Sequence, residues 1–165
     1  MRRTKTILVD MSNTYFIGID PGKTGAVAII YRDSYAAEDI PLMAGGDVNV
    51  NELSNMFVLY TPERRVFCLI EKAQPMPKQG VVSVFNYGKH YGELMAWLKI
   101  MMISFQEISP NKWKREFQLL GKDKKESVAV CQKLFPEAEL KTPRGRLLHG
   151  RAEALLLAEY ARRHF

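Results

Sequence analysis

The stretch FIGIDPGKTGAVAII, residues 16–30, determines how the rest of the chain is organised. It predicts a buried strand, a tight Pro-Gly turn and a second strand that runs back beside the first. Asp20 stands where the first strand ends, and an acidic side chain is costly to bury unless it has a partner. We therefore expect Asp20 either to shape the turn or to bind a cation.

The same stretch contains Gly22-Lys23-Thr24, which is part of the pattern of a phosphate-binding P-loop. A P-loop has four residues between its first glycine and the Gly-Lys pair, and it leads into a helix. Here only three residues separate Gly18 from Gly22, and a strand follows. The spacing excludes a P-loop.

Composition predicts one globular domain with an anionic partner. The chain has 165 residues, of which 47% are hydrophobic and 25% charged, and its formal net charge is +6. These values suit a single core and favour partners such as nucleic acid. The two cysteines, Cys68 and Cys131, form no zinc-binding pattern and favour a reducing compartment. No apolar run approaches the roughly 20 residues that cross a bilayer, and the basic start is not typical of a signal peptide.

The hydrophobic periodicity predicts an α/β fold. Strands are expected at residues 15–20, 26–31, 34–40, 65–71 and 103–108. Helices are expected at residues 51–60, 81–101, 111–120, 122–135 and 150–163. This order indicates a mixed sheet with helices on its faces. We predict a single domain over residues 15–165, preceded at residues 1–14 by a basic arm or an extra strand.

Two of the predicted buried strands end on a carboxylate, Asp20 and Glu71. If these strands are neighbours, the two acids converge at one edge of the sheet. His149 and Glu153 are four residues apart at the start of the last helix and so face the same way. Three carboxylates and a histidine suit a hard divalent cation, and two such ions can clamp a phosphodiester.

Each of these residues also has a purely structural interpretation. Asp20 could serve only as a turn former, and Glu71 could pair with Lys72 or a nearby arginine. His149 could simply begin the helix, and Glu153 could form an ion pair with Arg151 or another neighbour. The combination of strand ends and a helix favours the metal site over any one residue alone.

Three segments together resemble the RuvC-type Holliday junction resolvases: IGIDPG at residues 17–22, LIE at 69–71 and GRAEAL at 150–155. The resemblance covers roughly residues 15–163. It implies an RNase H-like fold with a mixed five-stranded sheet and helices on both faces. It also implies a homodimer that acts on four-way DNA junctions. Within the family, HGRAEAL at residues 149–155 is most similar to the chloroplast and virus-encoded branch.

The resemblance also implies roles for the site residues. Asp20, Glu71 and Glu153 match the family's metal-binding acids, and His149 stands where many members have an aspartate. His149 would then either bind metal as a neutral imidazole or act in proton transfer. The implied cofactors are two Mg²⁺ ions, for which Mn²⁺ can substitute. The implied reaction is symmetric nicking that leaves 5′-phosphate and 3′-hydroxyl ends.

A further match lies in SPNKWK, residues 109–114, where the resemblance implies DNA-contacting lysines at Lys114 and Lys125. Neighbouring cations extend this patch: Lys112, Arg115, Lys122 and Lys124. A second basic group near the predicted acid site suits phosphates: Arg144, Arg146 and Arg151. The alternative is a solvated helical face without a partner.

Bacterial relatives place an aromatic wedge three residues after the second acid, and Gln74 stands there in this chain. Phe85 and Tyr87 are possible replacements, although both also fit the buried face of the long helix. That helix, beginning at Val81, is the candidate dimer interface.

Two other functions remain open at this point. One is a module that binds branched DNA without cutting it, and the other is an RNase H-like nuclease with another substrate. An actin-like ATPase is disfavoured, because 165 residues are too few for its two lobes. The protein is expected to be cytoplasmic, nucleoid-associated or virus-encoded, or to lie in an organelle stroma or matrix if a transit peptide has been removed.

Overall fold

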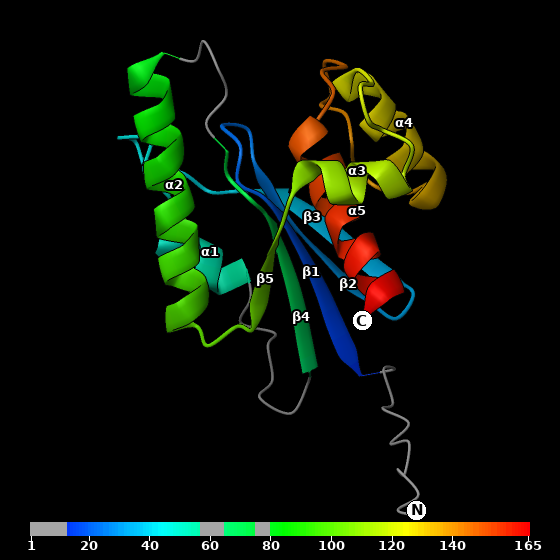
Figure 1. Cartoon of the computed structure of the whole chain (residues 1–165), viewed down its shortest axis with the longest axis horizontal. Helices are drawn as coiled ribbons and strands as arrows, with labels where there is room; N and C mark the ends of the chain where they lie inside the picture. The colour runs from blue at the N-terminus through cyan, green and yellow to red at the C-terminus, as the bar shows by residue number, and fades with distance from the viewer. Residues whose placement is uncertain (1–12, 57–64, 75–79) are drawn as a thin grey trace, which may run out of the picture.

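The computed structural model of the protein describes residues 13–56, 65–74 and 80–165. These residues form one mixed five-stranded sheet with helices on both faces (Figure 1). The strands are β1 (Thr14–Asp20), β2 (Ala26–Tyr31), β3 (Ser34–Asp39), β4 (Arg65–Glu71) and β5 (Phe105–Ile108). The helices are α1 (Val50–Met56), α2 (Val81–Ile100), α3 (Pro110–Glu116), α4 (Lys124–Leu134) and α5 (His149–His164).

The strand order is β3-β2-β1-β4-β5, which places β1 in the centre. The first three strands form an antiparallel meander, whereas β1, β4 and β5 run parallel. The α/β class and the mixed five-stranded sheet predicted from the sequence are confirmed. The predicted arm at residues 1–14 lies almost entirely outside the described residues.

Both faces of the central strands are buried, so neighbouring side chains enter different cores. In β1, Phe16 packs with the helices α3, α4 and α5, whereas Ile17 and Ile19 pack on the side of α1 and α2. In β4, Leu69 joins the first core, and Cys68 and Ile70 join the second. This alternation explains why these strands are apolar without a polar face.

Helix α5 is the central helix of the fold, and its residues 152–161 are all buried. It can lie directly on β1 because Gly18 has no side chain. A Cβ atom at Gly18 would stand 2.1 Å from the carbonyl oxygen of Ala154 and 2.5 Å from the nitrogen of Ala158. The close contact fixes α5 against the strand that carries Asp20.

Some predicted elements have different bounds in the structure, and one predicted end is not described. Strand β5 begins at Phe105, and the preceding buried Ile103 belongs to the connection from α2. Helix α3 ends at Glu116 because Gln118 has a positive φ of 57°, which a helix does not accommodate. Helix α1 is described to Met56, so the predicted end near residue 60 lies outside the described residues.

The predicted long helix is present as α2, but only its second half is buried. Leu94, Trp97 and Leu98 are buried, whereas the first turns carry the exposed apolar side chains of Val81, Val82 and Phe85. Within the described chain, no helix has the length and apolar character needed to cross a membrane.

Candidate active site

Three acidic residues converge at the edge of the sheet where β1 and β4 end, the upper end of the sheet in Figure 1. The two strands are parallel neighbours, and Ile19 lies opposite Ile70, so Asp20 and Glu71 reach the same edge. Helix α5 begins at this edge and brings in Glu153, which is 7% exposed. The predicted convergence of strand-end acids is therefore present.

The environment of Asp20 disfavours its negative charge. Burial raises the pKa of Asp20 to about 7, and the nearby charge of Glu153 adds to the effect, as Glu71 does more weakly. The backbone N–H of Gly22 opposes this rise by donating to Oδ1 of Asp20 at 3.0 Å. Asp20 therefore both shapes the turn and faces the other acids, so the two interpretations are compatible.

Glu71 has two partners on α3 that the sequence alone does not identify. Burial raises its pKa, while the ammonium of Lys114 and the Trp113 indole oppose the rise. Nε1 of Trp113 donates to Oε2 of Glu71 at 2.7 Å, and the Trp113 side chain is fully buried. Among the described residues, Glu71 thus interacts with Trp113 and Lys114 and not with Lys72, which was the structural alternative for this acid.

Lys114 also contacts the third acid, because its Nζ lies 3.5 Å from Oε1 of Glu153. The same ammonium stands 5.1 Å from the centre of the Trp113 ring. Of the two lysines at the start of α4, Lys124 is the one whose charge acts on both Asp20 and Glu71. Lys125, singled out by the resemblance, uses its backbone N–H to cap α4 through Asp123.

The donor set fits a divalent cation in charge and atom type. The three carboxylates lie at one buried edge, where burial and the neighbouring acids raise the pKa of Asp20 and of Glu71. A hard cation bound there would neutralise their negative charges. In the described parts of the chain, however, no three His, Cys, Asp or Glu side chains gather closely enough to share an ion. Each acid has a donor of its own: Gly22 for Asp20, Trp113 for Glu71 and Lys114 for Glu153.

His149 opens α5 and contacts the start of α4. Its Nδ1 lies 3.1 Å from the backbone carbonyl of Lys124. A carbonyl only accepts hydrogen bonds, so this contact favours the tautomer with the proton on Nδ1, which leaves Nε2 as a possible ligand atom. The ring lines a second cavity, which does not include Glu153 and is formed in part by residues 23–25 of the turn after β1.

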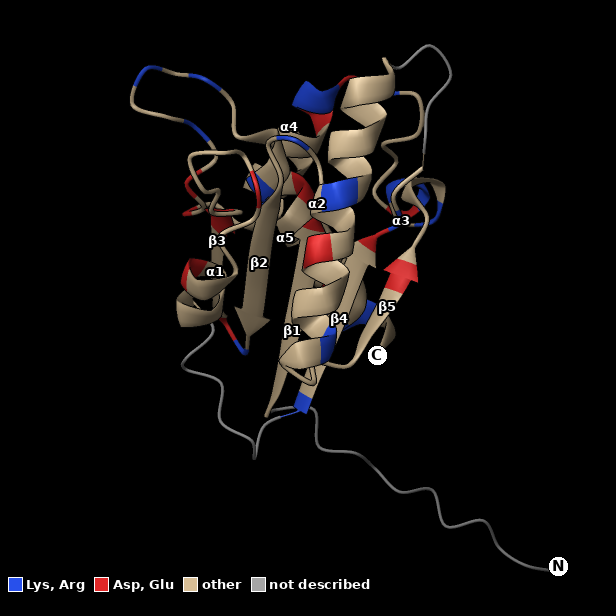
Figure 2. Ribbon diagram, turned by 90° about the vertical axis from the view of Figure 1, so that its left-hand side faces the viewer, with Lys and Arg blue, Asp and Glu red and all other residues tan. Residues whose placement is uncertain are grey.

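Figure 2 shows in blue where the described Lys and Arg residues stand along the ribbon. The other predicted DNA-binding residues divide into an exposed group and one paired residue. The exposed cations on α3, α4 and the connection between α4 and α5 are open to a ligand: Lys112, Arg115, Lys124, Lys125, Arg144 and Arg146. Arg151 differs, because its guanidinium pairs with Asp39 at 2.8 Å and with Glu38 at 3.0 Å. Its charge is directed to β3 and is already balanced there.

The two aromatic side chains proposed as wedge replacements occupy different environments. Phe85 is 70% exposed, which excludes the alternative that it packs on the buried face of α2. Tyr87 is half-buried, and burial raises the pKa of its hydroxyl to about 12, with further contributions from the charges of Glu71 and Asp20. Tyr87 thus borders the acid site from the α2 side. Gln74 is exposed, and the residues that follow it lie outside the described residues.

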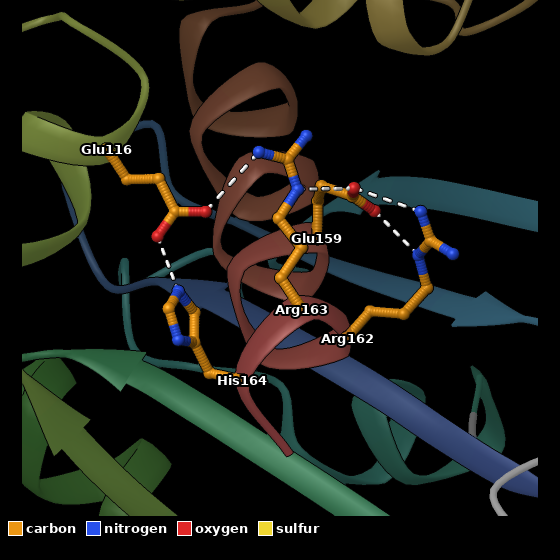
Figure 3. Close-up of polar contacts among 5 residues, drawn as sticks. All are labelled: Glu116, Glu159, Arg162, Arg163 and His164. Atoms are coloured by element: carbon orange, nitrogen blue, oxygen red, sulfur yellow. Dashed lines mark hydrogen bonds and ion pairs between the residues drawn. The ribbon is translucent and has the colours of Figure 1, made fainter.

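The helices that carry Lys114 and Glu153 are also joined at their far ends (Figure 3). Glu159, which is 3% exposed, accepts hydrogen bonds from Arg162 and from Arg163. Arg163 and His164 both contact Glu116 at the end of α3. This network fixes α3 against α5, and so it fixes the lysine relative to the acids.

Comparison with known proteins identifies the fold. By sequence, no protein-family model and no curated protein matches the chain. By structure, the chain is similar to Thermus thermophilus RuvC in complex with a Holliday junction substrate, with a TM-score of 0.60, 16% identity, and 92% of this chain and 96% of that chain covered. A second Thermus thermophilus RuvC structure has a TM-score of 0.56 at 16% identity, with 90% and 96% covered. The protein has the RNase H-like fold of RuvC.

Proposed function

We propose that this protein is a metal-dependent endonuclease that binds four-way DNA junctions as a homodimer and nicks two strands symmetrically. The observation that carries the proposal is the convergence of Asp20, Glu71 and Glu153 beside Lys114 in a RuvC-like fold. Similarity to a RuvC bound to a Holliday junction supports the choice of substrate. The net charge of +6 supports binding to DNA phosphates.

The three carboxylates would hold two Mg²⁺ ions, for which Mn²⁺ can substitute, and His149 could contribute Nε2. When bound, such ions activate water and stabilise the leaving oxygen of a phosphodiester, giving 5′-phosphate and 3′-hydroxyl ends. Trp113 and the backbone of Gly22 orient Glu71 and Asp20 by hydrogen bonds. Lys114 would exchange Glu153 for a DNA phosphate near the cut.

The homodimer would form through the first turns of α2. Val81, Val82 and Phe85 are 86%, 73% and 70% exposed, an unusual concentration of apolar side chains on a free surface. The same helix places Tyr87 beside the acids. A second copy of the chain on this face would hold two acid sites in a fixed relation, as two symmetric cuts require.

An assay with a labelled four-way junction tests the cleavage proposal. Wild-type protein should nick the junction in Mg²⁺, whereas Asp20→Asn should bind it without cutting. Asp33→Asn is a matched control, since Asp33 is exposed in the turn between β2 and β3 at the opposite end of β2 from Asp20. Full cleavage by the Asp20 variant would remove this carboxylate from the reaction.

The second candidate is a junction-binding module without cleavage. It is favoured by the absence, among the described residues, of three ligand side chains gathered for an ion. Wild-type protein that shifts a labelled junction but never nicks it in Mg²⁺ or Mn²⁺ would establish this alternative. Cleavage of a plain duplex or an RNA–DNA hybrid in preference to a junction would instead indicate a nuclease with another substrate.

A further inference from the structure

A cavity of about 380 Å³ lies next to the acid site, separated from it by the turn between β1 and β2. Its polar lining includes Lys23 from that turn, Arg146 from the connection before α5, and His149. A smaller cavity of about 210 Å³ lies on the other side of the α5 start and contains Glu153 and Lys114. The two cavities therefore flank the first turns of α5.

The two cations of the larger cavity are available to a ligand. Within the described residues, neither Lys23 nor Arg146 has a carboxylate within ion-pair distance. Asp39 also lines the cavity, and its carboxylate shares the guanidinium of Arg151 with Glu38. The lining therefore has two cations, Lys23 and Arg146, against the single carboxylate of Asp39, and this positive balance favours an anion.

The cavity has a rigid frame. A Cβ atom at Gly150 would stand 2.0 Å from the carbonyl oxygen of Thr24, so the start of α5 packs directly on the turn that carries Lys23. Arg146 is held in a short hairpin, in which its backbone N–H donates to Oγ1 of Thr142 and its carbonyl accepts from the N–H of Thr142. Both cations thus stand on backbone whose position is fixed relative to α5.

The lining is also suited to more than a bare anion. Leu42 and Leu147 provide apolar surface beside the two cations. No side chain of the described residues caps α5 at Leu148, so the positive end of the helix dipole adds to the field of Lys23 and Arg146. A phosphate with an attached sugar matches this combination of charge and apolar wall.

We propose that the cavity of Lys23 and Arg146 binds a backbone phosphate of the DNA strand next to the phosphate at the acid site. The proposal rests on the proposed function, because it assigns this contact to the same DNA substrate. The strand would cross the first turns of α5, with Lys114 and Lys124 on one side and Lys23 and Arg146 on the other. In this proposal Lys23 binds phosphate as part of the cavity lining, although the sequence around it is not a P-loop.

Junction binding as a function of salt concentration tests this assignment. The dissociation constant of a labelled four-way junction is measured in Ca²⁺ from 50 to 300 mM salt, roughly the range where phosphate contacts dominate. We expect Lys23→Gln and Arg146→Gln each to weaken binding about three- to thirtyfold and to reduce the salt slope by about 1. Lys99→Gln is the matched control, since Lys99 is exposed near the C-terminal end of α2, and it should bind as the wild type does.

The outcomes separate this inference from the proposed function. Wild-type protein that fails to bind the junction would contradict the function itself. Wild-type binding with unchanged affinity and slope in both variants would overturn the phosphate contact alone. A third arm titrates inorganic phosphate by NMR: loss of phosphate binding in the variants with normal junction binding would make the cavity a site for a free phosphate and would also overturn the proposal.

Discussion

At the scale of single residues, Asp20 illustrates the conflict between stability and function. Its pKa of about 7 lies well above the ordinary value of 3.8, chiefly because the group is buried. The folded protein without metal therefore binds a proton more tightly at Asp20 than the unfolded chain does. The contribution of this group to stability is full below pH 3.8 and is lost as the pH rises to about 7.

The first prediction follows from this loss of stability with rising pH. Asp20→Asn keeps an oxygen that can accept from Gly22 but removes the charge, so in EDTA at pH 8 it should raise the free energy of unfolding by about 1–4 kcal/mol. The gain should largely vanish at pH 4, where Asp20 in the wild-type protein is already protonated. Urea unfolding at the two pH values measures it, and an equal effect at both would show that the charge is not the cause.

A second prediction concerns Trp113. Trp113→Phe removes the donor to Glu71 and leaves space in the core, which should cost about 2–4 kcal/mol of unfolding free energy. The loss should be larger at high pH, where Glu71 is charged and most needs the hydrogen bond. Trp97→Phe is the control, since Nε1 of this buried tryptophan donates to the hydroxyl of Ser54 instead of a carboxylate. A loss with the same pH dependence in both variants would contradict the role given to Trp113.

These residues also mark how much of the site the sequence reveals. Asp20 and Glu71 are identifiable because an acid that ends an apolar strand is unusual, and Glu153 because of its place in HGRAEAL. The partners of these acids, Trp113 and Lys124, come from α3 and α4. Their roles depend on how the helices pack and have no local signature. The pairing of Arg151 with β3 is a tertiary contact of the same kind.

At the scale of elements, the position of α5 on β1 depends on Gly18. Gly18→Ala would place a Cβ atom 2.1 Å from the Ala154 carbonyl, against backbone that cannot rotate away. We expect it to lower the unfolding free energy by about 3 kcal/mol or more. Gly45→Ala is the control, because nothing lies within 4 Å of a Cβ there. Thermal unfolding compares them, and equal stability of the two variants would contradict the close contact.

Four of the five strands are predictable to within one residue at each end, because an apolar run between turn residues has few alternatives. The helices were less well defined. Val84 and Tyr87 have helical spacing in α2. Spacing alone does not show which part of the apolar face of a helix packs against the rest of the protein. In the structure the second half of this helix is buried, and its first turns are exposed.

At the scale of the whole molecule, the exposed end of α2 predicts self-association. Phe85→Ser should shift the protein from dimer toward monomer, because it removes a large apolar side chain from the proposed interface. Met102→Ser is the control, since Met102 is 91% exposed just beyond the other end of the helix. Sedimentation velocity at several concentrations measures the change. A wild-type protein that stays monomeric at high concentration would contradict the proposed dimer.

The most direct test of the account is a map of cleavage on a four-way junction in which each strand is labelled in turn. With Mg²⁺, we expect one nick in each of two opposite strands, at equivalent positions and with 5′-phosphate ends. Asp20→Asn, in the same assay, should bind the junction and leave all four strands intact. Wild-type protein that binds the junction but leaves every strand uncut in Mg²⁺ and in Mn²⁺ would contradict the proposed endonuclease.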